Sequence, residues 1–225
     1  MILFKRIKMG FTLAEVLVTL GIIGVVSVLT MPVLLQNYQQ KVYIGRLHSF
    51  YSLLSQALLN YQTEHNAVNL IEAGINSQDI TNSFINDTFK IVKICQNSLT
   101  PCFASSYKSI KGNKISGFDV VTSFVLANGT AVRPKYYGNQ YNNAFINILI
   151  DTNGTKGPNI HGRDLFNIGV YSNGLIDDID HLSKNTAPLS KERREELFNS
   201  KCLSNSTYVY GCFGKILNDN WEMNY

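Results

Sequence analysis

The apolar stretch from Phe11 to Leu35 constrains this chain more than any other feature of its sequence. It contains 25 residues, and a helix needs about 20 to cross the hydrocarbon core of a membrane. Its only charged side chain is Glu15, and inserting a lone carboxylate costs about 2.5–3.5 kcal/mol. We therefore expect a membrane-spanning helix in which Glu15 needs a partner.

A short basic leader precedes this stretch and ends at Gly10. Its cationic side chains are Lys5, Arg6 and Lys8. Such cations stay in the cytoplasm, which places the chain after Leu35 on the other side of the membrane. An ordinary secretory signal is cut after its apolar region, whereas cleavage at Gly10 would leave that region on the mature protein. The alternative is an uncleaved single-pass anchor that contains a glutamate by chance.

The string Gly10-Phe11-Thr12-Leu13-Ala14-Glu15 and the apolar helix after it resemble the N-terminal signal of type IV pilins and type II secretion pseudopilins. The resemblance covers the first quarter of the chain. It implies that a prepilin peptidase cuts after Gly10 and methylates the amine of Phe11. It also implies that subunits assemble through Phe11, through Glu15 and through Pro32, which matches the helix-disturbing proline of that family.

The resemblance further implies a structural subunit of a type II secretion pseudopilus or, as a close second, of a type IV pilus. The implied partners are the prepilin peptidase, the inner-membrane assembly machinery, and copies of this chain and related pilins. The chain would cross the inner membrane once, with its C-terminal head in the periplasm, before it enters a filament. Two alternatives stay open: a minor binding subunit at the filament tip, for adhesion, DNA uptake or recognition of a secreted substrate, and a membrane-tethered enzyme.

Motifs and charge argue against enzymatic activity and against nucleic-acid binding. The sequence contains no Gly-x-Ser-x-Gly elbow, phosphate loop, dinucleotide fingerprint or His-Glu-x-x-His motif, so we predict that the protein is not an enzyme. Removal of the leader would lower the net charge from +4 to +1, which leaves no electrostatic basis for nucleic-acid binding. The histidines are scattered and are expected to face solvent or to be satisfied by hydrogen bonds; they are His48, His65, His161 and His181.

The helix is expected to continue beyond the membrane, from about Thr12 to about Glu64. Apolar residues recur at helical spacing in its second half, at Leu47, Phe50, Leu54, Ala57, Leu58 and Tyr61. This stripe can carry a globular head. The predicted organisation is a leader at 1–10, the membrane-spanning and assembly half of the helix at 11–35, its amphipathic half at 36–65, and the head at 66–225.

The head reads as α+β, and with the long helix it resembles the pilin fold. Asn128-Gly129 between two apolar runs predicts a hairpin, and further strand signals follow it, which together imply an antiparallel meander packed on the helix stripe. The expected strands are 120–127, 131–137, 144–150, 166–171 and a short return at 175–176. The expected helices are 77–85, 191–198 with Ser190 as N-cap, and 209–217.

The four cysteines form two pairs that are close in sequence, Cys95 with Cys102 and Cys202 with Cys212. On the periplasmic side such pairs are read as disulfides. Four cysteines allow three connectivities, and we predict local pairing, with cross-pairing as the alternative. A zinc site normally has C-x-x-C spacing, which neither pair has.

A calcium ion is the one cofactor that the sequence brings into consideration. Asp151, Asn153 and Asp164 bracket a glycine-rich loop, and a second carboxylate cluster spans 177–180. Calcium prefers several hard oxygen ligands, and the major pseudopilins bind it in a C-terminal loop. Asp151-x-Asn153-Gly154 matches only the start of an EF-hand loop, however, and a simple turn also selects Asp and Asn. A turn without metal is therefore the alternative.

Overall fold

The computed structural model describes residues 10, 12–138, 144–181, 187–204 and 209–225. The chain divides into two compact units, Met1–Gln40 and Lys41–Tyr225. The boundary lies inside helix α1 (Leu13–Glu64), which is 52 residues long as the sequence predicts. Phe11 and residues 1–9 of the predicted leader lie outside the described residues.

In the first unit, α1 exposes apolar side chains around its whole circumference. Leu17, Ile23, Leu29 and Leu34 are each more than half exposed, and the helix continues through Pro32. An 18-residue window of α1 has a mean hydropathy of 2.4, so the helix is long and apolar enough to cross a membrane. A signal sequence near the N-terminus would meet the same criteria.

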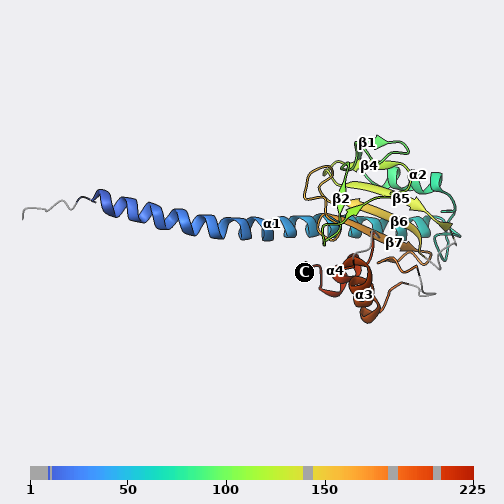
Figure 1. Ribbon diagram of the computed structural model, residues 1–225. Coiled ribbons are helices and arrows are strands. Elements are labelled where there is room, and N and C mark those ends of the chain that lie inside the picture. The colour runs from blue at the N-terminus through green and yellow to red at the C-terminus, as the bar shows by residue number, and fades with distance from the viewer. Residues whose placement is uncertain (1–9, 11, 139–143, 182–186, 205–208) are drawn as a thin grey trace, which may run out of the picture. The chain divides into compact units, whose positions relative to one another are not determined.

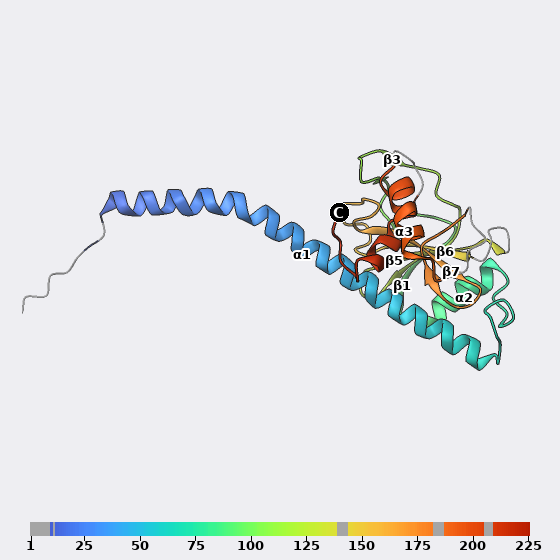
Figure 2. The same ribbon diagram turned by 90° about the horizontal axis from the view of Figure 1, so that it is seen from below.

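In the second unit, α1 becomes amphipathic and packs against a sheet (Figure 2). From Ile44 onward, the buried residues of this half recur every three or four positions; the buried residues are Tyr43, Ile44, Leu47, Phe50, Leu54 and Leu58. That spacing places them on one face of a helix. They share a core with Val132, Ile148 and Ile168 of the sheet, which confirms the predicted stripe.

The sheet has six antiparallel strands in the order β1-β4-β5-β6-β7-β8 (Figure 1). Its strands are β1 (Ile91–Cys95), β4 (Ser123–Leu126), β5 (Ala131–Tyr136), β6 (Ala144–Asp151), β7 (Leu165–Tyr171) and β8 (Ile176–Asp177). The predicted meander is therefore confirmed from β4 to β8. Asn128-Gly129 forms the first hairpin: Gly129 has a φ of 84°, and Phe124 pairs with Val132 across it.

Among the described residues, the unit also contains four shorter helices and a second small sheet. The helices are α2 (Gln78–Thr88), α3 (Lys191–Leu197), a π-helix (Phe198–Cys202) and α4 (Phe213–Asn218). The small sheet pairs β2 (Tyr107–Lys108) with β3 (Lys114–Ile115). Ser77 caps α2 by accepting the Ile80 N–H, and Ser190 caps α3 by accepting the Arg193 N–H. The α+β prediction is thus confirmed.

Strand β1 was not expected from the sequence. It pairs with β4 at the edge of the sheet, where Val92 and Ile94 are exposed. An edge strand of this kind lacks the alternation of buried and exposed residues that marks a half-buried strand. Pairing with β4 holds this segment in an extended conformation.

Both disulfides join the cysteines that lie close in sequence, Cys95 with Cys102 and Cys202 with Cys212. The second bridge ties the π-helix to the start of α4. Just before Cys212, the backbone lies so close to α3 that a Cβ on Gly211 would be 2.5 Å from the Leu197 carbonyl oxygen. Gly211 also has a φ of 90°, so glycine is required there for space and for conformation.

Candidate functional site

The start of α1 is closed by a reciprocal cap between Thr12 and Glu15. Oε2 of Glu15 accepts hydrogen bonds from the backbone N–H and from the hydroxyl of Thr12, both at 2.8 Å. In return, the backbone N–H of Glu15 donates to Oγ1 of Thr12 at 3.2 Å. This is a capping box, which satisfies N–H groups that a helix start leaves unpaired. Within one chain, therefore, Glu15 already has a partner.

The other residues predicted for processing and assembly lie on the same segment. Gly10 is exposed and lies two residues before Thr12, which caps the start of α1. Pro32 lies within the exposed apolar part of the helix. Phe11, the predicted methylated residue, lies outside the described residues.

The three calcium candidates come together in the loop after β6, and hydrogen bonds occupy the oxygens of its two carboxylates. The side-chain oxygen of Asn153 is buried without a hydrogen-bond partner among the described residues. Asp151 accepts from the Tyr107 hydroxyl at 2.5 Å and from the Asn153 N–H at 3.1 Å. The two oxygens of Asp164 accept the N–H groups of Asn159 and Ile160 at 2.8 and 2.7 Å. Calcium would have to replace these bonds. The arrangement favours the alternative of a hydrogen-bonded turn, and calcium binding stays a prediction.

Burial changes the proton affinity of this loop. Asp151 is fully buried, and burial, which disfavours the charged form, raises its pKa to about 7 despite the Tyr107 hydrogen bond. The folded protein therefore binds this proton more tightly than the unfolded chain does. By linkage, the contribution of Asp151 makes the free energy of unfolding fall as pH rises from about 4 to about 7.

We expect Asp151→Asn to reduce that pH dependence. One titrating group changes the slope by at most about 1.4 kcal/mol per pH unit, and asparagine can still accept the Tyr107 hydroxyl. Urea unfolding of the detergent-solubilised chain between pH 4 and 7.5, with a chelator present, measures the slope. Asp87→Asn removes an exposed carboxylate of α2 and serves as the control. Equal slopes for wild type and Asp151→Asn would contradict the assignment.

The second carboxylate cluster has structural partners rather than open ligand positions. Asp177 is paired with Arg194 and Asp180 with Arg193. Asp178 accepts the N–H groups of Gly211 and Gly214 at 2.8 and 2.6 Å. The cluster therefore anchors α3 and the start of α4 to the end of the sheet.

His161 corrects the expectation for the histidines. It is buried beside the second disulfide, with Nδ1 at 3.4 Å from Cys212 Sγ, and its Nε2 has no hydrogen-bond partner among the described residues. Burial lowers its pKa to about 3, so the imidazole is neutral. The sequence carries no signal for this position, because the contact joins residues 51 apart.

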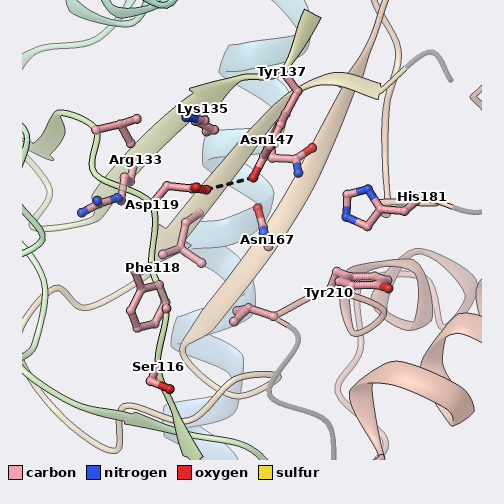
Figure 3. Close-up of a pocket in the computed structure, with 14 residues that line it drawn as sticks. Ser116, Phe118, Asp119, Arg133, Lys135, Tyr137, Asn147, Asn167, His181 and Tyr210 are labelled. Atoms are coloured by element: carbon pink, nitrogen blue, oxygen red, sulfur yellow. Dashed lines mark hydrogen bonds between the residues drawn. The ribbon is translucent and has the colours of Figure 1, made fainter. Parts of the chain in front are cut away.

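A cavity of about 300 Å³ opens on the face of the sheet opposite α1 (Figure 3). Its floor consists of side chains from three neighbouring strands: Arg133, Lys135, Asn147, Leu149 and Asn167. Side chains alternate between the faces of a strand, and the residues between these, such as Ile148 and Ile168, belong to the α1 core. The period-2 pattern of β5 to β7 therefore produces this second, polar face.

Segments distant in sequence form the walls of the cavity. Phe118 and Asp119 line one side, and His181 and Tyr210 line the other (Figure 3). Asp119 accepts a hydrogen bond of 2.8 Å from the Tyr137 hydroxyl. The rings of His181 and Tyr210 meet nearly at right angles, with centroids 5.0 Å apart. No motif in the sequence predicted this site; the alternating polar residues of the predicted strands were the signal that could have indicated it.

Comparisons of the chain with protein-family models, with curated proteins and with solved structures found no match. The function is therefore inferred from the residues and the geometry described above.

Proposed function

We propose that this chain is a pilin-like structural subunit of a filament, of the type II secretion pseudopilus or type IV pilus kind. The observation that carries the proposal is the division of α1 into two chemically different halves. One half exposes apolar residues on every side, and the other buries a single stripe under a sheet. A helix that is apolar all round needs a membrane or other helices around it. In such a subunit, the membrane would surround the helix before assembly, and the helices of neighbouring subunits would surround it in the filament.

The details of the N-terminus support the same proposal. Gly10 lies two residues before a helix that begins with a capping box, so cleavage there would leave α1 intact on the mature chain. The protein would span the inner membrane once with the second unit in the periplasm. Two disulfides in that unit fit an oxidising compartment.

A tip-located binding subunit is the second candidate, and the cavity on the outer face of the sheet favours it. The two roles differ in abundance. A major subunit would be present along the whole filament, whereas a tip subunit would be present in few copies. Quantitative mass spectrometry of sheared filaments decides between them.

We expect Gly10→Val to block processing. A branched side chain at the residue before the scissile bond would obstruct a peptidase site that accepts glycine. Intact-mass measurement of membrane-extracted protein should then show the full chain, and wild type should begin at N-methylated Phe11. Gly21→Val is the matched control, because a Cβ at Gly21 would meet no atom within 4 Å, and this variant should be cleaved. Wild type that keeps residues 1–10 in cells with active peptidase would refute the proposal.

A further inference from the structure

The cavity on the outer face of the sheet has the chemistry of a binding site. We propose that it binds an acidic saccharide unit, meaning a sugar ring that carries a carboxylate. This inference is independent of filament assembly, because every residue that carries it lies in the second unit of the chain.

The cavity has more cationic than anionic groups, which favours an anionic ligand. Arg133 and Lys135 contribute two cationic groups, and Asp119 contributes one carboxylate, which already accepts the Tyr137 hydroxyl. Arg133 is only 4% exposed, and its Nη1 donates to the neutral hydroxyl of Ser123 at 3.1 Å. The charge of Asp119 acts on this guanidinium, but among the described residues no carboxylate lies within 4.0 Å of it. A buried cation without a close counter-ion is unfavourable, and a bound carboxylate would relieve that cost.

The two asparagines on the floor require hydrogen-bond donors as well. Asn147 is 6% exposed, and the side-chain oxygens of Asn147 and Asn167 are buried without a hydrogen-bond partner among the described residues. Buried polar groups are normally satisfied. An amide offers one acceptor and two donors whichever way it is turned. A bare carboxylate or phosphate has few or no protons to donate, whereas the hydroxyl groups of a sugar both donate and accept.

Aromatic side chains provide the remaining surface. Phe118, Tyr137 and Tyr210 line the cavity around the polar floor (Figure 3). Such rings present flat apolar faces with polar tips, which suit the C–H faces and hydroxyl edges of a sugar ring. The volume of about 300 Å³ lies at the lower end of the range for small-molecule sites, so one or two sugar units would fit.

The test is calorimetric titration of the detergent-solubilised full chain with D-galacturonate and its dimer. Galactose, inorganic phosphate and N-acetyl-aspartate are the comparison ligands. We expect saturable binding of galacturonate at least about tenfold tighter than galactose, since one charge-assisted hydrogen bond contributes that much or more. Equal affinity for galactose, stronger binding of phosphate or N-acetyl-aspartate, or no binding at all would overturn the proposal.

Variants test the cationic side chains and the asparagine side chains of the cavity separately. Arg133→Gln and Lys135→Gln should each weaken galacturonate binding about tenfold or more and leave galactose binding unchanged. Asn167→Leu should weaken both sugars. Lys114→Gln removes an exposed cation outside the cavity and should change neither affinity. If Arg133→Gln fails to fold, Lys135→Gln still tests the charge. Unchanged galacturonate affinity in every folded cavity variant would also overturn the proposal.

Discussion

Replacing Glu15 with valine should abolish entry into filaments while leaving insertion, cleavage and the fold of the second unit intact. Valine suits a bilayer better than glutamate does. In a bundle of apolar helices, however, a carboxylate needs a partner, and removal of Gly10 would create a cationic amine at Phe11 of each neighbouring subunit. Immunoblots of sheared filament and membrane fractions measure the effect.

The capping box makes a sharper version of this experiment possible. In one chain, Glu15 closes α1 by accepting two Thr12 donors with Oε2. Among the described residues, its Oε1 accepts no hydrogen bond. Glutamine can close a capping box as glutamate does, but it carries no charge. Glu15→Gln therefore preserves the contact within the chain and removes only the attraction to a neighbouring amine.

The three variants give distinct results. If the role of Glu15 is intermolecular, Glu15→Gln and Glu15→Val both fail to assemble, and each enters filaments only when mixed with wild type. If Glu15 serves only as a cap, Glu15→Gln assembles normally and Thr12→Val, which loses the cap but keeps the charge, resembles Glu15→Val. Normal assembly of Glu15→Val alone would show that filaments need no contact between Glu15 and a neighbouring amine.

Replacing Arg194 with methionine should lower the free energy of unfolding by about 3–5 kcal/mol. Asp177 is fully buried, and Arg194 binds both of its oxygens, through Nε at 2.9 Å and Nη2 at 2.6 Å. Among the described residues, the buried carboxylate would then keep the N–H donors of Asp178 and Leu189 and no others. Removing one partner of a buried pair is costly because the other charge remains.

Two controls distinguish this explanation from simple loss of packing. The double variant Asp177→Asn with Arg194→Met removes both charges and should recover a large part of the loss. Glu196→Gln breaks an ion pair to Arg193 in which the glutamate side chain is 65% exposed, and it should cost no more than about 1 kcal/mol. Urea unfolding measures all three. A loss as large in the double variant as in Arg194→Met would show that packing rather than charge is responsible.

Local patterns were sufficient to predict most of the secondary structure. Asn128-Gly129 predicts its hairpin because few other dipeptides adopt that turn, and Ser190 predicts the start of α3 because its hydroxyl replaces a missing backbone acceptor. The predicted last helix, 209–217, is shorter than expected and begins only at Phe213. Gly211 and the Cys202–Cys212 bridge shape the residues before it, and that constraint comes from the contact with α3.

The candidate sites also fall into two groups: those that local sequence spacing indicates and those that depend on tertiary contacts. Gly10 and Glu15 were singled out from the sequence because their relation is one of spacing along a short continuous segment of the chain. Asp177 and Asp180 looked like metal ligands because their partners, Arg194 and Arg193, lie 17 and 13 residues away. The sequence shows which charged residues are present but does not indicate which of them form ion pairs.

By itself, the sequence determined where α1 begins, that it is apolar throughout its first half, and which stripe of its second half is buried. Those properties depend on the order of neighbouring residues and on helical periodicity. Only the tertiary structure decided that Arg133, Asn147 and Asn167 share a cavity and that His161 lies buried against Cys212. These groups meet because strand register and chain crossings bring together residues that are far apart in sequence, and no local pattern records such an encounter.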